Sequence, residues 1–280
     1  MFPTSSSMNY VWLKDGTPLH YIEQGGGRPV VLLGAMMYSA RHFWRKNIGP
    51  LADRCRVIAL DPRGHGQSGK PNFGYTIGGL ADDLHEFLEA KQLEGAVIVG
   101  VAISAFILIE YLKRYGHRRV AAVSIVEMTP RLVSAPGWAH PTFGDFPQEA
   151  ADNFGNGIRA DKARAGLRGF FQAGYVKPVS EEELTKIMAE TWLMPTDAIA
   201  DLSDAWVKED VRADLANMPV PTLLMYGGPG NKLLPTGVGR WVHEQIPGSR
   251  YVEFSDSGHN PFLEEPDKFN AELLRFVKEL

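Results

Sequence analysis

Short apolar runs recur along this chain, and helix-like segments lie between several of them. The runs are VVLLG (30–34), RVIAL (56–60), GAVIVG (95–100), VAAVSIV (120–126) and PTLLMYG (221–227). Continuous apolar runs of this length are typical of strands buried on both faces of a parallel sheet. Helical spacing is found over residues 76–91 and over 103–115, where Gly116 ends the segment. This alternation predicts an α/β fold with a mostly parallel sheet and right-handed crossovers.

Both ends of the chain predict further elements of that sheet, whereas a middle segment breaks the alternation. YVWL and LHYIEQ flank KDGTP and predict a β-hairpin, and YVEF (251–254) predicts a late strand before a closing helix over 264–279. Between Met128 and about Met218 the pattern is helical and interrupted by Pro and Gly. We therefore predict a core of residues 1–127 and 219–280. The helical cap of residues 128–218 is expected over the carboxyl ends of the strands.

Charge and composition limit the kinds of partner that the chain can have. The net charge is −4, from 29 basic and 33 acidic residues without a long run of either sign, which argues against nucleic acid or a membrane as partner. The single cysteine, Cys55, cannot form an intrachain disulfide. MFPTSSSMNY lacks the pattern of a signal peptide. We expect a cytoplasmic protein that acts on a small molecule, and its oligomeric state stays open.

Three motifs occur in an order known from one protein family. They are LDPRGHGQSGKP (60–71), VGVAISA (99–105) and SGHNPFLEEPDKF (257–269). Together they resemble the α/β-hydrolase superfamily, in its serine esterase and lactonase branch that includes macrolide esterases and zearalenone-type lactonases. The resemblance covers most of the chain outside the cap. It implies an eight-stranded, mostly parallel sheet flanked by helices, with the cap inserted after the sixth strand.

In that family a strained turn between strand and helix presents a catalytic serine, and here Ala102 occupies the position. Gly100 and Ser104 are its small neighbours, and we expect Ser104 to pack in the first helical turn rather than to act as a nucleophile. Ala102 allows three interpretations. The first is an engineered change that leaves an inactive variant. The second is the natural state of a ligand-binding protein, and the third is a chemistry without a serine, such as cofactor-independent dioxygenation. We favour the first, because the other catalytic positions are retained.

The resemblance assigns His259 as the catalytic base and leaves two positions for the acid that orients it. Glu127 follows the predicted sixth strand, whereas Asn231 stands in the loop after the next strand, where the family commonly has Asp. We prefer Glu127, although a structural pairing of Glu127 with Arg131 is the alternative. The oxyanion hole is assigned to the N–H groups of Ile103 and of Met36 or Met37.

The aromatic cap and the apolar loop at Met36 favour a bulky, mostly apolar ester or lactone as substrate, and the most specific prediction is a macrocyclic lactone such as a macrolide. The predicted substrate contacts are Ala35, Tyr38, Phe106, Trp138 and Trp192. No ligand set for a metal is recognisable, and GGG (25–27) lacks the following helix of a dinucleotide site. We therefore expect neither a metal nor a cofactor.

Overall fold

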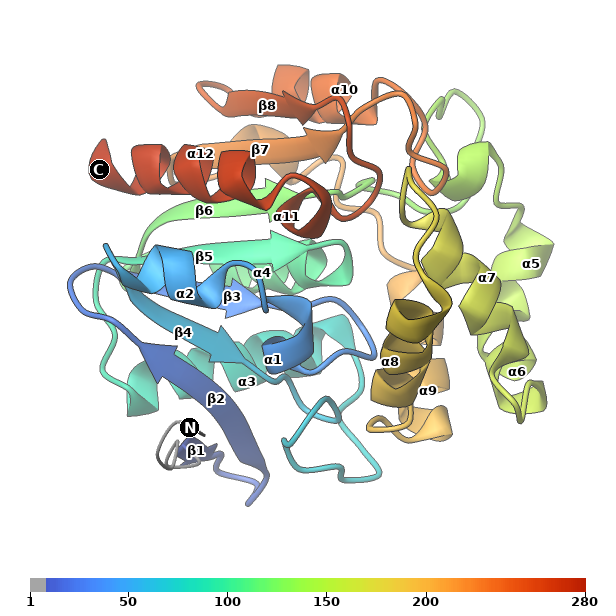
Figure 1. Ribbon diagram of the computed structural model, residues 1–280, viewed down its shortest axis with the longest axis horizontal. Coiled ribbons are helices and arrows are strands. Elements are labelled where there is room, and N and C mark those ends of the chain that lie inside the picture. The colour runs from blue at the N-terminus through green and yellow to red at the C-terminus, as the bar shows by residue number, and fades with distance from the viewer. Residues whose placement is uncertain (1–8) are drawn as a thin grey trace.

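One sheet of eight strands runs through the molecule in the computed structural model, which describes residues 9–280 (Figure 1). Residues 1–8, which begin the segment considered for a signal peptide, lie outside the described residues. The strand order is β1-β2-β4-β3-β5-β6-β7-β8. The strands are β1 Asn9–Trp12, β2 Pro18–Gln24, β3 Pro29–Leu33, β4 Arg56–Leu60, β5 Ala96–Val101, β6 Val120–Val126, β7 Thr222–Gly227 and β8 Arg250–Phe254.

The sheet has the mostly parallel pairing that the sequence predicts. β2 pairs antiparallel with both β1 and β4, and all the other neighbouring strands pair in parallel. Every residue of β5 is buried, as expected for a central strand covered on both faces. The α/β-hydrolase-type sheet expected from the sequence is therefore confirmed.

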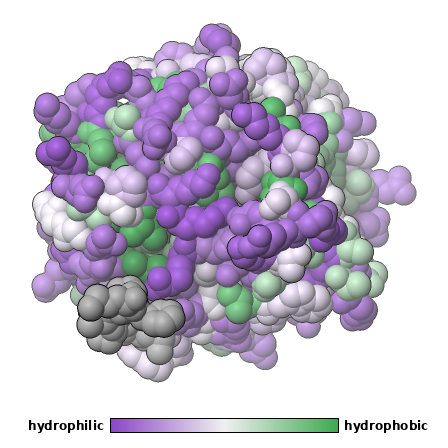
Figure 2. All heavy atoms as spheres, viewed as in Figure 1, coloured by the Kyte–Doolittle hydropathy of each residue, from purple (hydrophilic) through white to green (hydrophobic). Residues whose placement is uncertain are grey.

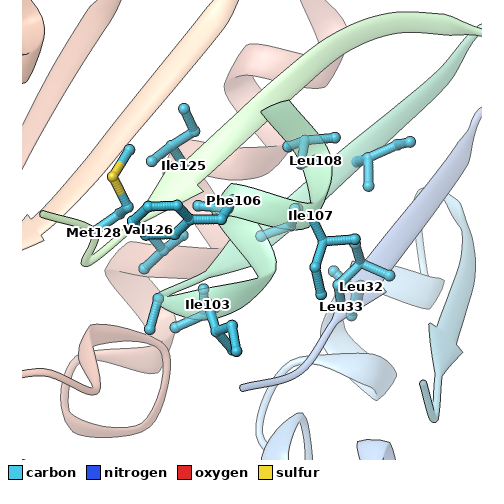
Figure 3. Close-up of a cluster of buried hydrophobic side chains, with 14 of the residues drawn as sticks. Leu32, Leu33, Ile103, Phe106, Ile107, Leu108, Ile125, Val126 and Met128 are labelled. Carbon is cyan, nitrogen blue, oxygen red and sulfur yellow. The ribbon is translucent and has the colours of Figure 1, made fainter. Parts of the chain in front are cut away.

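Helices cover both faces of this sheet, with α2 and α12 in front of it and α3 and α4 behind it in the view of Figure 1. The helices outside residues 128–218 are α1 Ala40–Phe43, α2 Ile48–Ala52, α3 Ile77–Ala90, α4 Ile103–Tyr115, α10 Val238–Gln245, α11 Pro261–Glu264 and α12 Pro266–Lys278. Figure 3 shows Phe106, Ile107 and Leu108 of α4 among the buried side chains of β3 and β6. This apolar packing fixes the start of α4, and therefore position 102, against the sheet.

Between β6 and β7 the chain forms the helices α5 Gln148–Asp152, α6 Phe154–Ala160, α7 Ala165–Ala173, α8 Glu181–Thr191 and α9 Thr196–Trp206. We call residues 128–218 the cap segment. Figure 1 shows its helices beside the end of the sheet toward which the arrows of β5 and β6 point. The division of the chain into two domains at these boundaries stays a prediction.

The outer surface is mainly polar where Figure 2 displays it, with apolar side chains scattered among hydrophilic ones. Within residues 9–280, none of the helices has the length and apolar character needed to cross a membrane.

Candidate active site

Ala102 occupies a strained turn between β5 and α4. Its φ of 50° and ψ of −115° are unfavourable for a residue with a side chain, and such strain is common at functional sites. The amide of Ala102 donates to Val126 O at 3.0 Å, which ties the turn to β6. A Cβ at Gly100 would lie 2.8 Å from the main-chain oxygen of Ser104, so the crossing of strand and helix requires glycine there.

Ser104 lies in the first turn of α4, as the sequence predicts. Its side chain is buried, and its hydroxyl donates to the carbonyl oxygen of Gly34. Ser104 does not line the cavity that Ala102 borders. The hydroxyl therefore holds the loop after β3 to α4 rather than facing a substrate.

His259 and Glu127 form a hydrogen-bonded pair in the cavity that Ala102 also lines. The Nδ1 atom of His259 is 2.9 Å from Oε2 of Glu127, whose side chain is fully buried. Because Nδ1 bonds to the carboxylate, Nε2 is the ring nitrogen available to accept a proton from a neighbour. Ala102, Glu127 and His259 all line the same cavity. The structure thus brings together the three positions that sequence reasoning placed at the catalytic centre.

Glu127, rather than Asn231, contacts the imidazole. Asn231 Nδ2 donates to Glu127 Oε2 at 2.6 Å, and the Gly227 amide donates to Oε1. These donors, together with His259, offset the cost of burying a carboxylate. Arg131, the alternative partner of Glu127, bonds instead to Asp210 at 2.9 Å. Both positions considered for the acid therefore belong to one hydrogen-bond network, in which the side-chain amide of Asn231 donates to the carboxylate of Glu127.

The loop that carries His259 is fixed by both the core and the cap segment. The amide of His259 donates to Gly174 O at 2.8 Å, and Glu264 accepts from the amides of Gly258 and Val176 at 2.7 and 2.9 Å. Burial raises the pKa of the Glu264 carboxyl above its ordinary value. This loop consequently depends on the position of the chain after α7.

The three residues predicted for the oxyanion hole line the same cavity as Ala102. Ile103 is the first residue of α4, so its N–H has no partner within the helix. Met37 has a φ of 74°, and this unusual backbone turns the loop after β3 at the cavity wall. Met36 and Met37 line the cavity together with Ile103. Their assignment to an oxyanion hole stays a prediction.

The cavity has a volume of about 460 Å³, which is the size of a typical small-molecule site. Ala35 and Tyr38 line it, as the sequence predicts. Most of the wall is apolar and comes from the cap segment, which the sequence predicts to be helical, rich in aromatic residues and placed over the carboxyl ends of the strands. The apolar residues that it contributes include Leu132, Phe143, Phe146, Phe154, Ile158, Leu167, Phe170, Phe171, Ile199 and Trp206.

Phe106, Trp138 and Trp192, three predicted substrate contacts, do not line the cavity, and this corrects their assignment. Phe106 is fully buried in the core because α4 turns it toward the sheet. Trp138 packs against Trp241, with ring centroids 4.9 Å apart, and its indole N–H donates to Arg131 O. Trp192 is 56% exposed and carries the guanidinium of Arg164 over its ring at 4.3 Å.

Arg164 is a cavity residue that sequence reasoning missed. It is buried and bonds to the carbonyl oxygens of Thr191 and Met194 and to Thr196 Oγ1. Burial lowers the pKa of its guanidinium below the ordinary value. Asp161 also lines the cavity, and its carboxylate accepts from the amides of Ala165 and Gly166 at the start of α7. In the part of the chain that the structure describes, no group of three or more His, Cys, Asp or Glu side chains is arranged to hold a metal ion.

Comparison with known proteins places this geometry in a family. A family model described as "Alpha/beta hydrolase family" matches residues 19–272. The chain is 28% identical over 274 residues to the AB hydrolase superfamily protein YisY of Bacillus subtilis, covering 96% of this chain and 98% of that protein. It is 26% identical over 272 residues to the non-heme chloroperoxidase CPO-A1 of Kitasatospora aureofaciens, covering 94% of this chain and 97% of that protein.

A solved structure agrees with this assignment. The esterase of Exiguobacterium antarcticum superposes with a TM-score of 0.88 at 26% identity, and the match covers 97% of this chain and 99% of that one. The chain therefore belongs to the alpha/beta hydrolase family. Its relatives include esterases, which is consistent with a serine ester hydrolase framework.

Proposed function

We propose that this site is built to hydrolyse a carboxylic ester or lactone, and that Ala102 makes the chain an inactive variant of such an enzyme. The observation that carries the proposal is the His259–Glu127 pair, 2.9 Å apart, in the same cavity as the strained position 102. A hydroxyl at position 102 would complete the Ser-His-acid arrangement of this chemistry.

The reaction follows from the roles of these groups. His259 Nε2 removes the proton from a hydroxyl at position 102, and the oxygen of that hydroxyl attacks the carbonyl carbon of the ester. The N–H groups of Ile103 and of Met36 or Met37 bind the oxyanion. The bond to the alcohol oxygen then breaks, and His259 returns the proton to the alcohol. Water, activated by His259, hydrolyses the acyl-enzyme in the same way, and Glu127 orients the imidazole throughout.

The apolar wall favours a bulky, mostly apolar substrate. Apolar surface is favourable to bury, so a large hydrocarbon portion gains affinity from aromatic side chains such as Phe146, Phe154 and Phe171. A lactone is a cyclic ester and reacts at the same kind of carbonyl. Within this class we propose a macrocyclic lactone such as a macrolide, because the motifs resemble those of macrolide esterases.

The test is to restore the hydroxyl by Ala102→Ser and to assay a panel of p-nitrophenyl esters with short and long acyl chains, together with a macrocyclic lactone. Loss of such a nucleophile costs on the order of 10⁶ in turnover, so the change should produce a comparable gain over the unaltered chain. The double variant Ala102→Ser/His259→Ala is the matched control and should lose the gain. An Ala102→Ser protein that hydrolyses none of the panel would refute the proposal.

Ala102 itself favours a second candidate, a ligand-binding protein without catalysis. In that case the unaltered chain binds its ligand tightly and Ala102→Ser gains no hydrolysis. Cofactor-independent dioxygenation is a third alternative, and consumption of oxygen by the unaltered chain that is lost in His259→Ala would support it. The chloroperoxidase relative makes halide-dependent oxidation with peroxide a useful additional assay.

A further inference from the structure

The loop after β3, residues 34–40, is held by the core at both of its ends. The carbonyl oxygen of Gly34 accepts from Ser104 on α4, and the amide of Ala40 donates to Asp61 Oδ1 at 2.6 Å. Asp61 is buried, and its other oxygen bonds to His20 and to the amide of Gln67. These two ends are therefore fixed to rigid parts of the fold.

Between those fixed ends, side chains of the cap segment hold the loop from three different helices. Met36 Sδ lies 3.7 Å from the hydroxyl of Ser203 on α9. The ring of Tyr38 packs edge-on against Phe171 of α7, with centroids 5.3 Å apart. The amide of Ser39, which is buried, donates to Glu190 Oε2 of α8 at 2.9 Å.

The Glu190 contact is the one that acts on the main chain of the loop. Ser39 is two residues beyond Met37, which lines the cavity and has a left-handed backbone with a φ of 74°. A hydrogen bond to the Ser39 amide fixes the peptide plane between residues 38 and 39. Oxyanion donors lose much of their effect when misplaced, because removal of one donor typically lowers kcat by about 10²- to 10³-fold.

We propose that Glu190 is a positioning residue that couples the cap segment to the oxyanion loop, residues 34–40. Its carboxylate holds the Ser39 amide and thereby the N–H groups at positions 36 and 37. The inference rests on the proposed function, because it assigns those N–H groups to the oxyanion hole. The cap segment thus contributes to transition-state binding as well as to the substrate wall.

Glu183 provides a matched control on the same helix. It lies about two turns before Glu190 on α8, pairs with Arg45 just beyond α1, and has its Oε1 3.9 Å from His42 Nε2 on α1. Glu183→Gln therefore weakens contacts of the cap segment with Arg45 and α1, while the hydrogen bond from the Ser39 amide to Glu190 stays in place. Glu190→Gln keeps an oxygen that can accept from the Ser39 amide, whereas Glu190→Ala removes the acceptor.

The first measurement is hydrogen exchange of the Ser39 amide in the otherwise unaltered chain, and it needs no catalysis. We expect Glu190→Ala to accelerate exchange at least about tenfold, because it removes the acceptor of this buried amide. Glu190→Gln and Glu183→Gln should leave the exchange rate within about threefold. Unchanged exchange in Glu190→Ala would overturn the proposal.

The second measurement is steady-state ester hydrolysis in the Ala102→Ser background. Glu190→Ala should lower kcat by about 10- to 100-fold with little change in KM. Glu190→Gln should keep most of the parent kcat. Glu183→Gln should lower kcat less than threefold. Equal losses in Glu190→Ala and Glu183→Gln would show a merely structural role and overturn the proposal. If Ala102→Ser hydrolyses no ester, the proposed function fails, and the exchange measurement alone decides whether Glu190 holds the loop.

Discussion

Replacement of Glu127 by Gln in the Ala102→Ser protein tests the hydrogen bonding of the buried acid. In the structure the carboxylate accepts from three donors, Gly227 N on Oε1 and both Asn231 Nδ2 and His259 Nδ1 on Oε2. A glutamine side chain has the same shape but only one acceptor oxygen, and its amide group donates. At least one of the donors must therefore lose its partner or meet another donor.

The size of the loss in kcat or in stability depends on which of the three donors loses its acceptor. If the amide group faces His259, the imidazole bonds to it through an unprotonated Nδ1, and Nε2 then carries the hydrogen and cannot act as the base. The corresponding change in a known serine protease lowers kcat by about 10⁴-fold, so here we expect kcat to fall by about two to four orders of magnitude. If the amide group faces Gly227, one buried N–H is unsatisfied at a cost of about 1 to 3 kcal/mol in stability.

The assay is steady-state hydrolysis of the best p-nitrophenyl ester, accompanied by urea unfolding of each variant. Asn231→Ala is the matched control, because it removes one donor and keeps the carboxylate. Its kcat should stay within about tenfold of the parent, since His259 keeps its acceptor. A Glu127→Gln variant that retains kcat within threefold, with unchanged stability, would refute the assignment of Glu127 as the acid.

The remaining predictions concern stability and are measured by urea unfolding. Hydrogen bonds from Arg212 lower the pKa of Asp210 to about 2, so its stabilisation is present above about pH 4 and is lost as the pH falls toward 2. Asp210→Asn should cost about 1 kcal/mol at pH 7 after allowance for solvent screening, and clearly less at pH 2, where the carboxyl is half protonated; an equal cost at both would contradict this. Gly100→Ala should destabilise by about 1 to 3 kcal/mol, whereas Gly49→Ala, with open space for a Cβ, should be nearly neutral. Phe262→Ala should cost about 3 to 5 kcal/mol because its ring is fully buried, and a loss below 1 kcal/mol would contradict the packing.

The sequence could predict the sheet and the turn at Ala102 because both depend on local pattern. Continuous apolar runs indicate burial on both faces of a strand, and small residues at 100 and 104 indicate a close crossing of strand and helix. Glu127 could be considered because it directly follows a predictable strand. Its partner Asn231 lies about a hundred positions away, so only the fold reveals that the two share one hydrogen-bond network.

The substrate wall could not be predicted to the same extent, because it depends on how the cap helices pack. Trp138 and Trp192 are large aromatic residues of the cap segment, yet one packs on Trp241 and the other is exposed. Arg164 gave no sequence signal at all, since nothing local indicates a guanidinium buried against carbonyl oxygens. Side-chain direction on short helices joined by loops is decided by tertiary contacts.

Covalent trapping at position 102 is the most direct test of a site built around an activated hydroxyl. A fluorophosphonate reacts with an activated serine hydroxyl, and peptide mapping by mass spectrometry locates the adduct. We expect stoichiometric labelling of the peptide that contains position 102 in Ala102→Ser, and none in the unaltered chain or in Ala102→Ser/His259→Ala. No adduct in Ala102→Ser, or labelling that persists without His259, would contradict it.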